Sequence, residues 1–181
     1  MPHSQRLLLI GLLMAGIVAA DQLSKEFAVR HLQGRPAITC PKSWAPNDLF
    51  RIQYAENTGA FLSLGSRLPE GMRFWTLTVL NLIILSAIGL FLAFKPVLPR
   101  ATALALTLIL AGGVGNIIDR VFRDGRVVDF MNLGIGYGRW SLRTGIFNIA
   151  DLGIVGGLVL LVAIELKQAK SARSQDPSKP A

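Results

Sequence analysis

Residues suited to disulfide, thiol or metal chemistry are almost missing from this 181-residue sequence, which contains one cysteine and two histidines. The single cysteine, Cys40, cannot form a disulfide within the chain. With only His3 and His31 available, it also makes a poor metal site or catalytic Cys/His pair. We therefore predict no metal site and interpret Cys40 as incidental.

Charged residues are scarce as well, and acidic ones especially. Hydrophobic residues make up 51% of the chain and charged residues 17%, and 19 basic against 11 acidic residues give a net charge of +8. A soluble domain of this length cannot bury so much apolar surface, so lipid must be part of the solvent. The basic residues lie at the ends of apolar runs and in loops, without an aromatic-interleaved basic face. This pattern favours contact with lipid headgroups and argues against a nucleic-acid partner.

Lysine and arginine are absent from four apolar stretches, residues 7–20, 74–94, 101–118 and 152–164. A membrane-spanning helix needs about 20 residues. The first and last stretches reach that length only by including Asp21 to Lys25 and Asn148 to Asp151, which places acidic groups near one end of each. We predict an integral membrane, mainly α protein with four transmembrane helices, at about 7–25, 74–94, 101–121 and 146–166.

The first stretch also fits a second interpretation, a cleaved signal peptide. Arg6 precedes the apolar run, and Val18, Ala19 and Ala20 resemble a small-residue cleavage site. Cleavage would leave three helices, whereas retention makes Asp21 to Lys25 the polar end of a spanning helix.

Alternation of four spans puts the loops 26–73 and 122–145 on one side of the membrane. Both termini and residues 95–100 then share the other side. Basic residues are densest on the side of the termini, which favours cytoplasmic termini and extracytoplasmic long loops.

The long loops contain patterns typical of strands. Residues 49–64 are rich in aromatic and aliphatic side chains around Asn57-Thr58-Gly59, which suits short strands on either side of a turn. Residues 140–147 suit another strand. We predict a small extramembrane sheet on the helices, one membrane-embedded domain over residues 1–166, and a polar disordered tail over residues 167–181.

Ionisable groups at membrane depth are costly and usually functional. Asp21 and Lys25 are four residues apart, so they share a helix face and can form an ion pair. The pair could belong to a functional site, or it could simply neutralise the end of a helix at the membrane interface. Asn116, Asp119 and Arg120 share a face at the end of the third helix. There Arg120 could hold Asp119 ionised through a bidentate contact, which we interpret as a structural clamp.

Asp129 and Asp151 have different surroundings. Asp129 lies in the apolar segment Val127-Val128-Asp129-Phe130-Met131, where burial would raise its pKa. Asp151 follows Asn148 by three, a spacing at which Asn148 caps the fourth helix and the helix dipole favours an ionised Asp151. A pair with one protonated and one ionised carboxyl has the asymmetry of an acid/base dyad, and a water between them would cleave a peptide bond. The alternative, purely structural interpretation is that Asp151 only takes part in capping the helix.

Five short motifs, taken in order, resemble those of the type II signal peptidases, the bacterial lipoprotein signal peptidases. They cover nearly the whole chain, and they are Asp21-Gln22-Leu23-Ser24-Lys25, Asn57-Thr58-Gly59-Ala60, Gly115-Asn116-Ile117-Ile118-Asp119-Arg120, Val128-Asp129-Phe130 and Phe147-Asn148-Ile149-Ala150-Asp151.

This resemblance implies a four-helix fold with a small extracytoplasmic antiparallel sheet that cradles the substrate. It implies an aspartic endopeptidase of the bacterial inner membrane, with Asp129 and Asp151 as the catalytic pair and no metal or organic cofactor. The substrate would be a prolipoprotein that enters from lipid, and cleavage would fall just before a diacylglyceryl-cysteine. We expect a monomer. The residues that would shape or support the site are Asp21, Lys25, Asn57, Gly59, Asn116, Asp119, Arg120, Asn148 and Ala150.

Two segments depart from the family pattern. Phe61 and Leu62 follow Asn57-Thr58-Gly59-Ala60, where the family has a second small residue and then an aromatic one. Residues 33–47, which include Cys40, match no family motif. The altered loop keeps open an inactive relative that binds lipidated peptides without cleaving them. The acidic residues themselves leave open a second alternative, a proton-coupled transporter in which Asp129, Asp151 and Asp119 relay protons.

Overall fold

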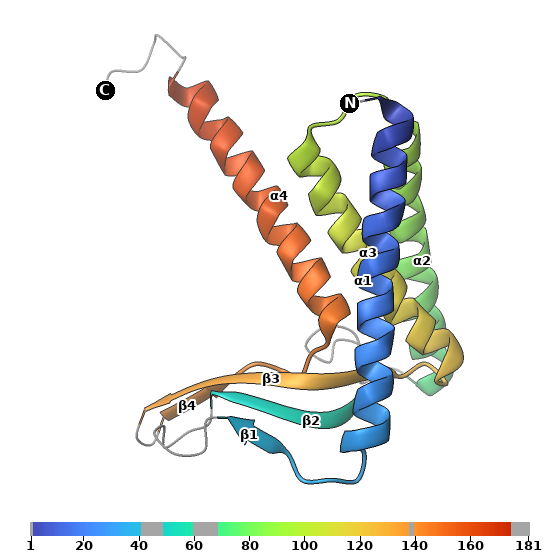
Figure 1. Ribbon diagram of the computed structural model, residues 1–181, viewed down its shortest axis with the longest axis vertical. Helices are drawn as coiled ribbons and strands as arrows, with labels where there is room; N and C mark the ends of the chain where they lie inside the picture. The colour runs from blue at the N-terminus through green and yellow to red at the C-terminus, as the bar shows by residue number, and fades with distance from the viewer. Residues whose placement is uncertain (1, 41–48, 60–68, 138–139, 175–181) are drawn as a thin grey trace.

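The computed structural model describes residues 2–40, 49–59, 69–137 and 140–174. Four helices form a bundle, and a small sheet lies across one end of it (Figure 1). The first and the last described residues lie at the opposite end of the bundle. In chain order the elements are α1 His3–Leu32, β1 Ile38–Cys40, β2 Phe50–Asn57, α2 Glu70–Phe94, α3 Arg100–Phe122, β3 Val127–Tyr137, β4 Trp140–Arg143 and α4 Ile149–Ser174.

All four helices are long and apolar enough to span a membrane, so the chain is a multi-pass membrane protein. Three of them begin directly after a proline, namely Pro2, Pro69 and Pro99. A proline pushes the residue before it out of the α region, which fixes where each helix can start. α1 runs without a break through the segment that resembles a cleavage site.

All four helices are longer than the sequence predicts, and α1 and α4 exceed their predicted lengths most. α1 continues seven residues past Lys25, to Leu32, because Arg30 and Glu26 form an i, i+4 ion pair at 2.7 Å and the end of the helix packs against the sheet. α4 begins at Ile149 and continues to Ser174, so the prediction of a disordered tail is wrong for residues 167–174. The Ser171 hydroxyl donates to the Lys167 carbonyl at 3.0 Å within that extension.

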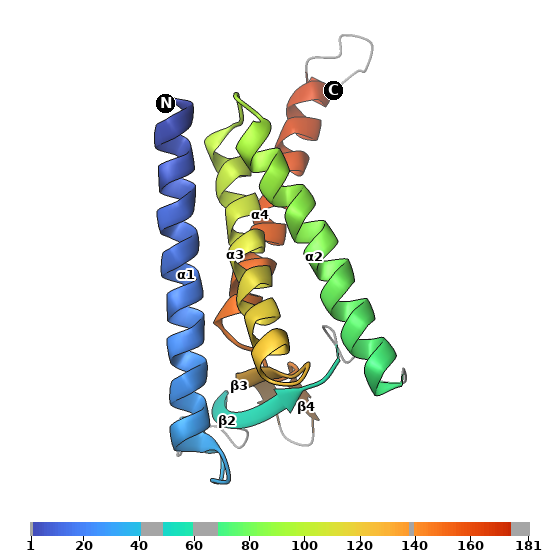
Figure 2. The ribbon, with the colours of Figure 1, turned by 90° about the vertical axis from the view of Figure 1, so that its right-hand side faces the viewer.

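α3 lies at the centre of the bundle and packs against the other three helices (Figure 2). Its contact with α4 is close because glycine faces backbone there. A Cβ at Gly157 would lie 2.5 Å from the Ala105 carbonyl oxygen, and one at Gly153 would lie 3.2 Å from that of Leu108. Gly153 and Gly157 are four residues apart, so this small-residue spacing marks a close helix contact.

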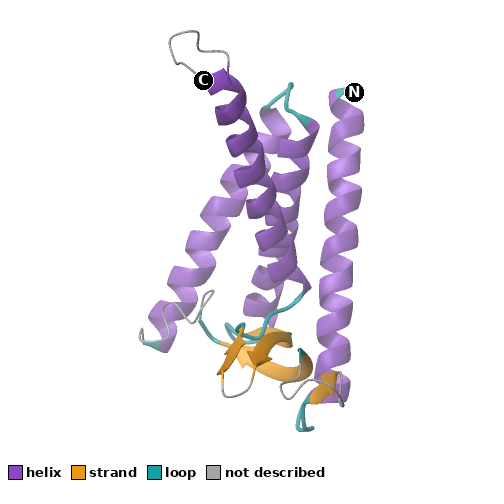
Figure 3. Cartoon of the chain, turned by 90° about the vertical axis from the view of Figure 1, so that its left-hand side faces the viewer, coloured by secondary structure: helices purple, strands orange, loops and turns teal. Residues whose placement is uncertain are grey.

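The buried apolar residues fall into two clusters. Leu85, Leu92, Ala103 and Leu110 join α2 to α3 inside the bundle. Ala28, Leu32 and Val128 join the end of α1 to the sheet. The second cluster packs the sheet against the end of α1, and Figure 3 shows the sheet at that end of the bundle from the side.

The sheet is antiparallel, with the strand order β1-β2-β3-β4. β2 ends at Asn57, the start of the predicted turn, but its described partners are β1 and β3. The strand expected beyond that turn falls on residues 60–68, outside the described part. The strand predicted at residues 140–147 is present as β4 and a single bridge from Phe147 to Met131. β3 was not predicted, because the sequence indicated a loop around Asp129.

Candidate active site

Asp129 and Asp151 come from different elements, and both carboxyls are hydrogen-bonded to one residue, Asn148. Asp129 lies on β3 and is 2% exposed. Its Oδ1 accepts a hydrogen bond from Asn148 Nδ2 at 2.7 Å. Asp151 lies in the first turn of α4, and its Oδ2 accepts from the Asn148 backbone N–H at 3.2 Å. The two carboxyls that the sequence paired are therefore bridged by one residue.

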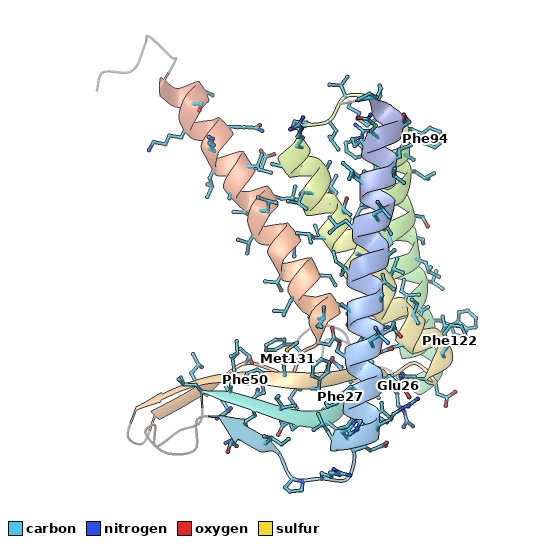
Figure 4. The ribbon with its side chains drawn as sticks, in the orientation of Figure 1. Glu26, Phe27, Phe50, Phe94, Phe122 and Met131 are labelled. Carbon is cyan, nitrogen blue, oxygen red and sulfur yellow. The ribbon has the colours of Figure 1, made fainter. Side chains whose placement is uncertain are left out.

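The side of the sheet that carries Asp129 is turned toward the helices. Asp129 and Met131 are two residues apart on β3 and so share a face. Figure 4 shows Met131 on the face of β3 that looks toward α4. Ile52, which is paired with Met131, and Ala55, which is paired with Asp129, lie beside them on β2.

Asn57 holds the second oxygen of Asp129. Its Nδ2 donates to Asp129 Oδ2 at 3.1 Å, while its Oδ1 accepts from the Gly59 backbone N–H at 2.9 Å. The second bond shapes the turn at the end of β2 and fixes the amide orientation, so the nitrogen must face Asp129.

Asn116 of α3 does the same for Asp151. Its Nδ2 donates to Asp151 Oδ1 at 2.9 Å. Its Oδ1 accepts from Lys25 Nζ at 3.1 Å and from Asn148 Nδ2 at 3.2 Å. Because two donors occupy the oxygen, the amide nitrogen has to point at Asp151.

Lys25 is fully buried between two carboxylates. Its Nζ lies 2.8 Å from Asp21 Oδ2 and 3.1 Å from Asp119 Oδ2. The predicted pairing of Asp21 with Lys25 is confirmed, and Asp119 completes it. A buried ammonium between two carboxylates avoids the cost of an unpaired charge at membrane depth.

These two carboxylates also fix the backbone beside each catalytic candidate. Asp21 Oδ1 accepts from the backbone N–H of Ala150 at 2.8 Å. Asp119 Oδ2 accepts from the backbone N–H of Val128 at 3.0 Å. Ala150 precedes Asp151 and Val128 precedes Asp129, so the cluster around Lys25 sets the positions of both carboxyls.

Arg120 differs from its expected role. The carboxylate of Asp119 pairs with Lys25 and, at 3.4 Å, with Arg123. Arg120 instead donates to the Gly59 carbonyl at 3.0 Å and to the Gly125 carbonyl at 3.4 Å. The prediction that Arg120 holds Asp119 through a bidentate contact is thus wrong, because the Arg120 side chain extends to the turn that begins at Asn57.

The surroundings of Asp129 favour its neutral form. Burial, and then the negative charge of Asp151, raise its pKa to about 7, against hydrogen bonds from Asn57 and Asn148 and the charge of Lys25, which lower it. At neutral pH this carboxyl is therefore poised between its two protonation states. Asp151 accepts two hydrogen bonds at the positive end of a helix dipole, which stabilise an ionised carboxylate.

Two supporting residues were missed by the sequence analysis. Gln22 Nε2 donates to the Gly115 carbonyl at 3.0 Å and to Asp21 Oδ2 at 3.1 Å. Arg123 joins Asp119 to Glu26, at 3.4 Å and 3.6 Å. The i, i+4 spacing of Asp119 and Arg123 was the available signal.

Two predicted features lie partly or wholly outside the described residues. Ala60, Phe61 and Leu62 belong to the undescribed segment 60–68, and so does the altered loop that they form. The segment 33–47 is described only up to Cys40, whose backbone lies in β1. Among the residues that the structure describes, no group of His, Cys, Asp and Glu could hold a metal ion.

Comparison with known proteins points to one family. The family model described as "Signal peptidase (SPase) II" matches residues 13–167. A lipoprotein signal peptidase of Rhodococcus jostii (strain RHA1) is 36% identical over 171 residues, which cover 91% of this chain and 75% of that protein. One of Hydrogenovibrio crunogenus (strain DSM 25203 / XCL-2) is 34% identical over 167 residues, or 90% of each chain.

A solved structure described as a bacterial membrane enzyme, at 2.3 Å resolution, superposes with a TM-score of 0.73. It is 26% identical in sequence, and the match covers 96% of this chain and 94% of that one. A second bacterial membrane enzyme gives a TM-score of 0.70 at 28% identity, over 88% of this chain and 93% of that one. The chain therefore belongs to the signal peptidase II family, the lipoprotein signal peptidases, which are aspartic peptidases that remove signal peptides from prolipoproteins.

Proposed function

We propose that Asp129 and Asp151 are the catalytic pair and that they hydrolyse the peptide bond just before a diacylglyceryl-cysteine in a prolipoprotein. The observation that carries this proposal is the bridge through Asn148, which bonds one oxygen of each carboxyl, at 2.7 Å and 3.2 Å. A shared partner holds the two groups in a constant relation, as acid/base catalysis on one bound water requires.

The roles of the two carboxyls follow from their surroundings. Asp151, ionised at the start of α4, removes a proton from the water as the water oxygen attacks the carbonyl carbon. Asp129, protonated below about pH 7, donates its proton to the carbonyl oxygen. The tetrahedral intermediate then collapses and the C–N bond breaks. Asp151 gives its proton to the leaving amine of the cysteine, and one hydroxyl of the intermediate returns a proton to Asp129, which restores the pair.

The remaining polar residues would orient this pair rather than react. Asn57 and Asn116 each hold one carboxylate oxygen, at 3.1 Å and 2.9 Å. Lys25 orients Asn116 and neutralises two neighbouring carboxylates. Arg120 anchors the Gly59 turn. Asp21 and Asp119 hold the backbone at Ala150 and Val128.

We further propose that the sheet faces the outside of the inner membrane and that both termini are cytoplasmic. The substrate would approach from lipid, with its signal helix beside the helices and its cleavage site above the face of the sheet that carries Asp129. One chain carries all of these residues, so a monomer would be sufficient.

Cleavage of a diacylglyceryl-modified prolipoprotein by the purified protein tests the reaction. We expect cleavage before the lipidated cysteine in the wild type, and loss of cleavage in Asp129→Asn and Asp151→Asn. Asp124→Asn is the matched control, because Asp124 is exposed in a turn with φ 52°, which asparagine also adopts. Full turnover by both dyad variants would refute the pair. A folded wild type that binds the substrate without cleaving it would instead identify an inactive relative.

Labelling with a membrane-impermeant maleimide tests the topology. Gln33 follows α1 at the sheet end and Gln168 lies in the last turns of α4, and both are exposed. In a Cys40→Ser background, we expect Gln33→Cys to react in intact spheroplasts and Gln168→Cys to react only after lysis. The reverse pattern would place the sheet in the cytoplasm.

A further inference from the structure

A second polar cluster lies on β3 beyond the catalytic candidates and outside the five sequence motifs. Asn132, three residues after Asp129, is 4% exposed. Its Nδ2 donates to the carbonyl oxygens of Thr144 at 2.7 Å and Gly145 at 3.4 Å. Its Oδ1 accepts from Arg143 Nη1 at 2.7 Å. An asparagine that is buried and bonded at both ends ties together the backbone that it touches.

The backbone that Asn132 holds leads directly to α4, the helix that carries Asp151. Thr144 and Leu133 are joined by a hydrogen bond from the Thr144 N–H at 2.8 Å and one to the Thr144 hydroxyl at 3.0 Å. Phe147 and Met131 then exchange backbone hydrogen bonds at 2.8 Å and 2.9 Å. The next residue is Asn148, which bonds both carboxyls, so residues 144–147 act as a strap between β3 and α4.

Gly134 makes room for the arginine that holds Asn132. A Cβ at this position would lie 2.8 Å from Arg143 Cζ and 3.0 Å from its Nη1. The Arg143 side chain therefore occupies the space that a Cβ at Gly134 would fill, and its guanidinium reaches Asn132 from there. Gly134 of β3 and Arg143 of β4 are directly paired. The strand register therefore places the guanidinium of Arg143 beside Gly134.

We propose that Asn132 is a positioning residue for the peptidase reaction, because it fixes the strap over residues 144–147 to β3 and thereby sets Asp151 relative to Asp129. Asn132 touches neither carboxyl and acts through the strap and Asn148. This inference rests on the proposed function of the pair.

Asn132→Leu tests the proposal, because leucine has the same branched arrangement of side-chain heavy atoms and removes all three side-chain hydrogen bonds. We expect kcat to fall by about 10- to 100-fold, which is the effect of a displacement of about 1 Å in a catalytic group. KM should stay close to the wild-type value, because Asn132 does not contact substrate. Thr39→Ala, on the edge strand β1, is the control and should leave both constants unchanged.

The result that overturns the proposal is a folded Asn132→Leu enzyme with the kcat of the control. Should Asn132→Leu fail to fold, Arg143→Gln keeps the amide donor of Asn132 and removes the guanidinium that orients it. We then expect a smaller loss of kcat at constant KM, and a kcat equal to that of the control overturns the proposal.

The two proposals fail in different ways. An inactive wild type, or active Asp129→Asn and Asp151→Asn variants, would refute the proposed function. An active wild type, inactive dyad variants and a fully active Asn132→Leu variant would refute only the positioning role of Asn132.

Discussion

Asn148 and Asp151 cap each other at the start of α4. The backbone N–H of Asp151 donates to Asn148 Oδ1 at 2.9 Å, and the backbone N–H of Asn148 donates to Asp151 Oδ2 at 3.2 Å. This reciprocal arrangement is a capping box, which satisfies two N–H groups that a helix otherwise leaves unpaired. The same Asn148 also bonds Asp129. One asparagine therefore starts the helix and joins the two catalytic candidates.

Substitution of Asn148 can separate capping from bridging. Serine is a good N-cap but is too short to reach Asp129 and Asn116, so Asn148→Ser should keep most of the stability and lose about 100-fold in kcat. Asn148→Ala should lose the activity and also about 0.5–2 kcal/mol of unfolding free energy. Thermal unfolding in detergent and cleavage kinetics measure the two effects. An Asn148→Ser enzyme with wild-type kcat would mean that the residue serves only as a cap.

The pH dependence of cleavage should report the protonation of Asp129. Its pKa is raised to about 7, and the reaction needs its protonated form, so kcat should fall as the pH rises through that value. Asn57 donates a hydrogen bond that stabilises the ionised form. Asn57→Ala should therefore raise the pKa of Asp129 and move the alkaline limb to higher pH.

Gln53→Ala, a change on the same strand, is the control for this pH profile and should leave the limb in place. An alkaline limb that stays fixed or moves to lower pH in Asn57→Ala would contradict the assignment of Asp129 as the acid.

Lys25 and Arg30 offer a comparison of a buried and an exposed ion pair on one helix. Lys25→Met leaves Asp21 and Asp119 without the buried ammonium between them, and only Asp119 keeps a second cation, Arg123. This change should cost about 3–5 kcal/mol of unfolding free energy. Arg30→Met removes an exposed pair with Glu26, which should leave the unfolding free energy nearly unchanged because solvent screens the pair.

The double variant Lys25→Met/Asp21→Asn checks this explanation. It removes one of the two opposed carboxylates, so it should be more stable than Lys25→Met alone. If the second change destabilises the protein further, the cost of Lys25→Met lies in lost packing and not in uncompensated charge.

The helices could be predicted from the sequence because the signal is local. An apolar run without Lys or Arg from residue 74 to 94 predicts a span by itself, and α2 ends at Phe94 as expected. The far end of α1 could not be predicted, since its residues up to Leu32 are polar or mixed in sequence. They are helical because Ala28 and Leu32 pack against Val128 of the sheet, a contact between distant parts of the chain.

In the candidate site, too, contacts between residues close in sequence could be predicted and contacts between distant residues could not. The spacing of Asp21 and Lys25 predicted their pairing, and that of Asn148 and Asp151 predicted the helix cap. The predicted partner of Arg120, Asp119, was wrong because the acceptor that Arg120 binds, the Gly59 carbonyl, is 61 residues away in sequence. Sequence spacing gives no information on contacts that depend on how a turn folds over a helix end.

Gly115 gives the most direct test of how tightly the charged cluster is packed. A Cβ at this position would lie 2.6 Å from Asp21 Oδ2 and 3.3 Å from the Cβ of Ala150. Asp21 cannot move away, because Lys25 and the Ala150 N–H hold its two oxygens. Gly115→Ala should therefore displace the start of α4, destabilise the protein by about 1–3 kcal/mol, and lower kcat.

Gly156→Ala is the matched control, because nothing lies within 4 Å of a Cβ at that position of α4. Alanine is favoured over glycine inside a helix, so this variant should be up to about 1 kcal/mol more stable than wild type and fully active. Opposite effects of the same substitution at two helical glycines would show that space beside Asp21, and not helix propensity, decides the outcome. A Gly115→Ala enzyme as stable and active as the Gly156→Ala enzyme would mean that the Asp21 cluster tolerates displacement, and that the backbone bond from Ala150 does not fix Asp151.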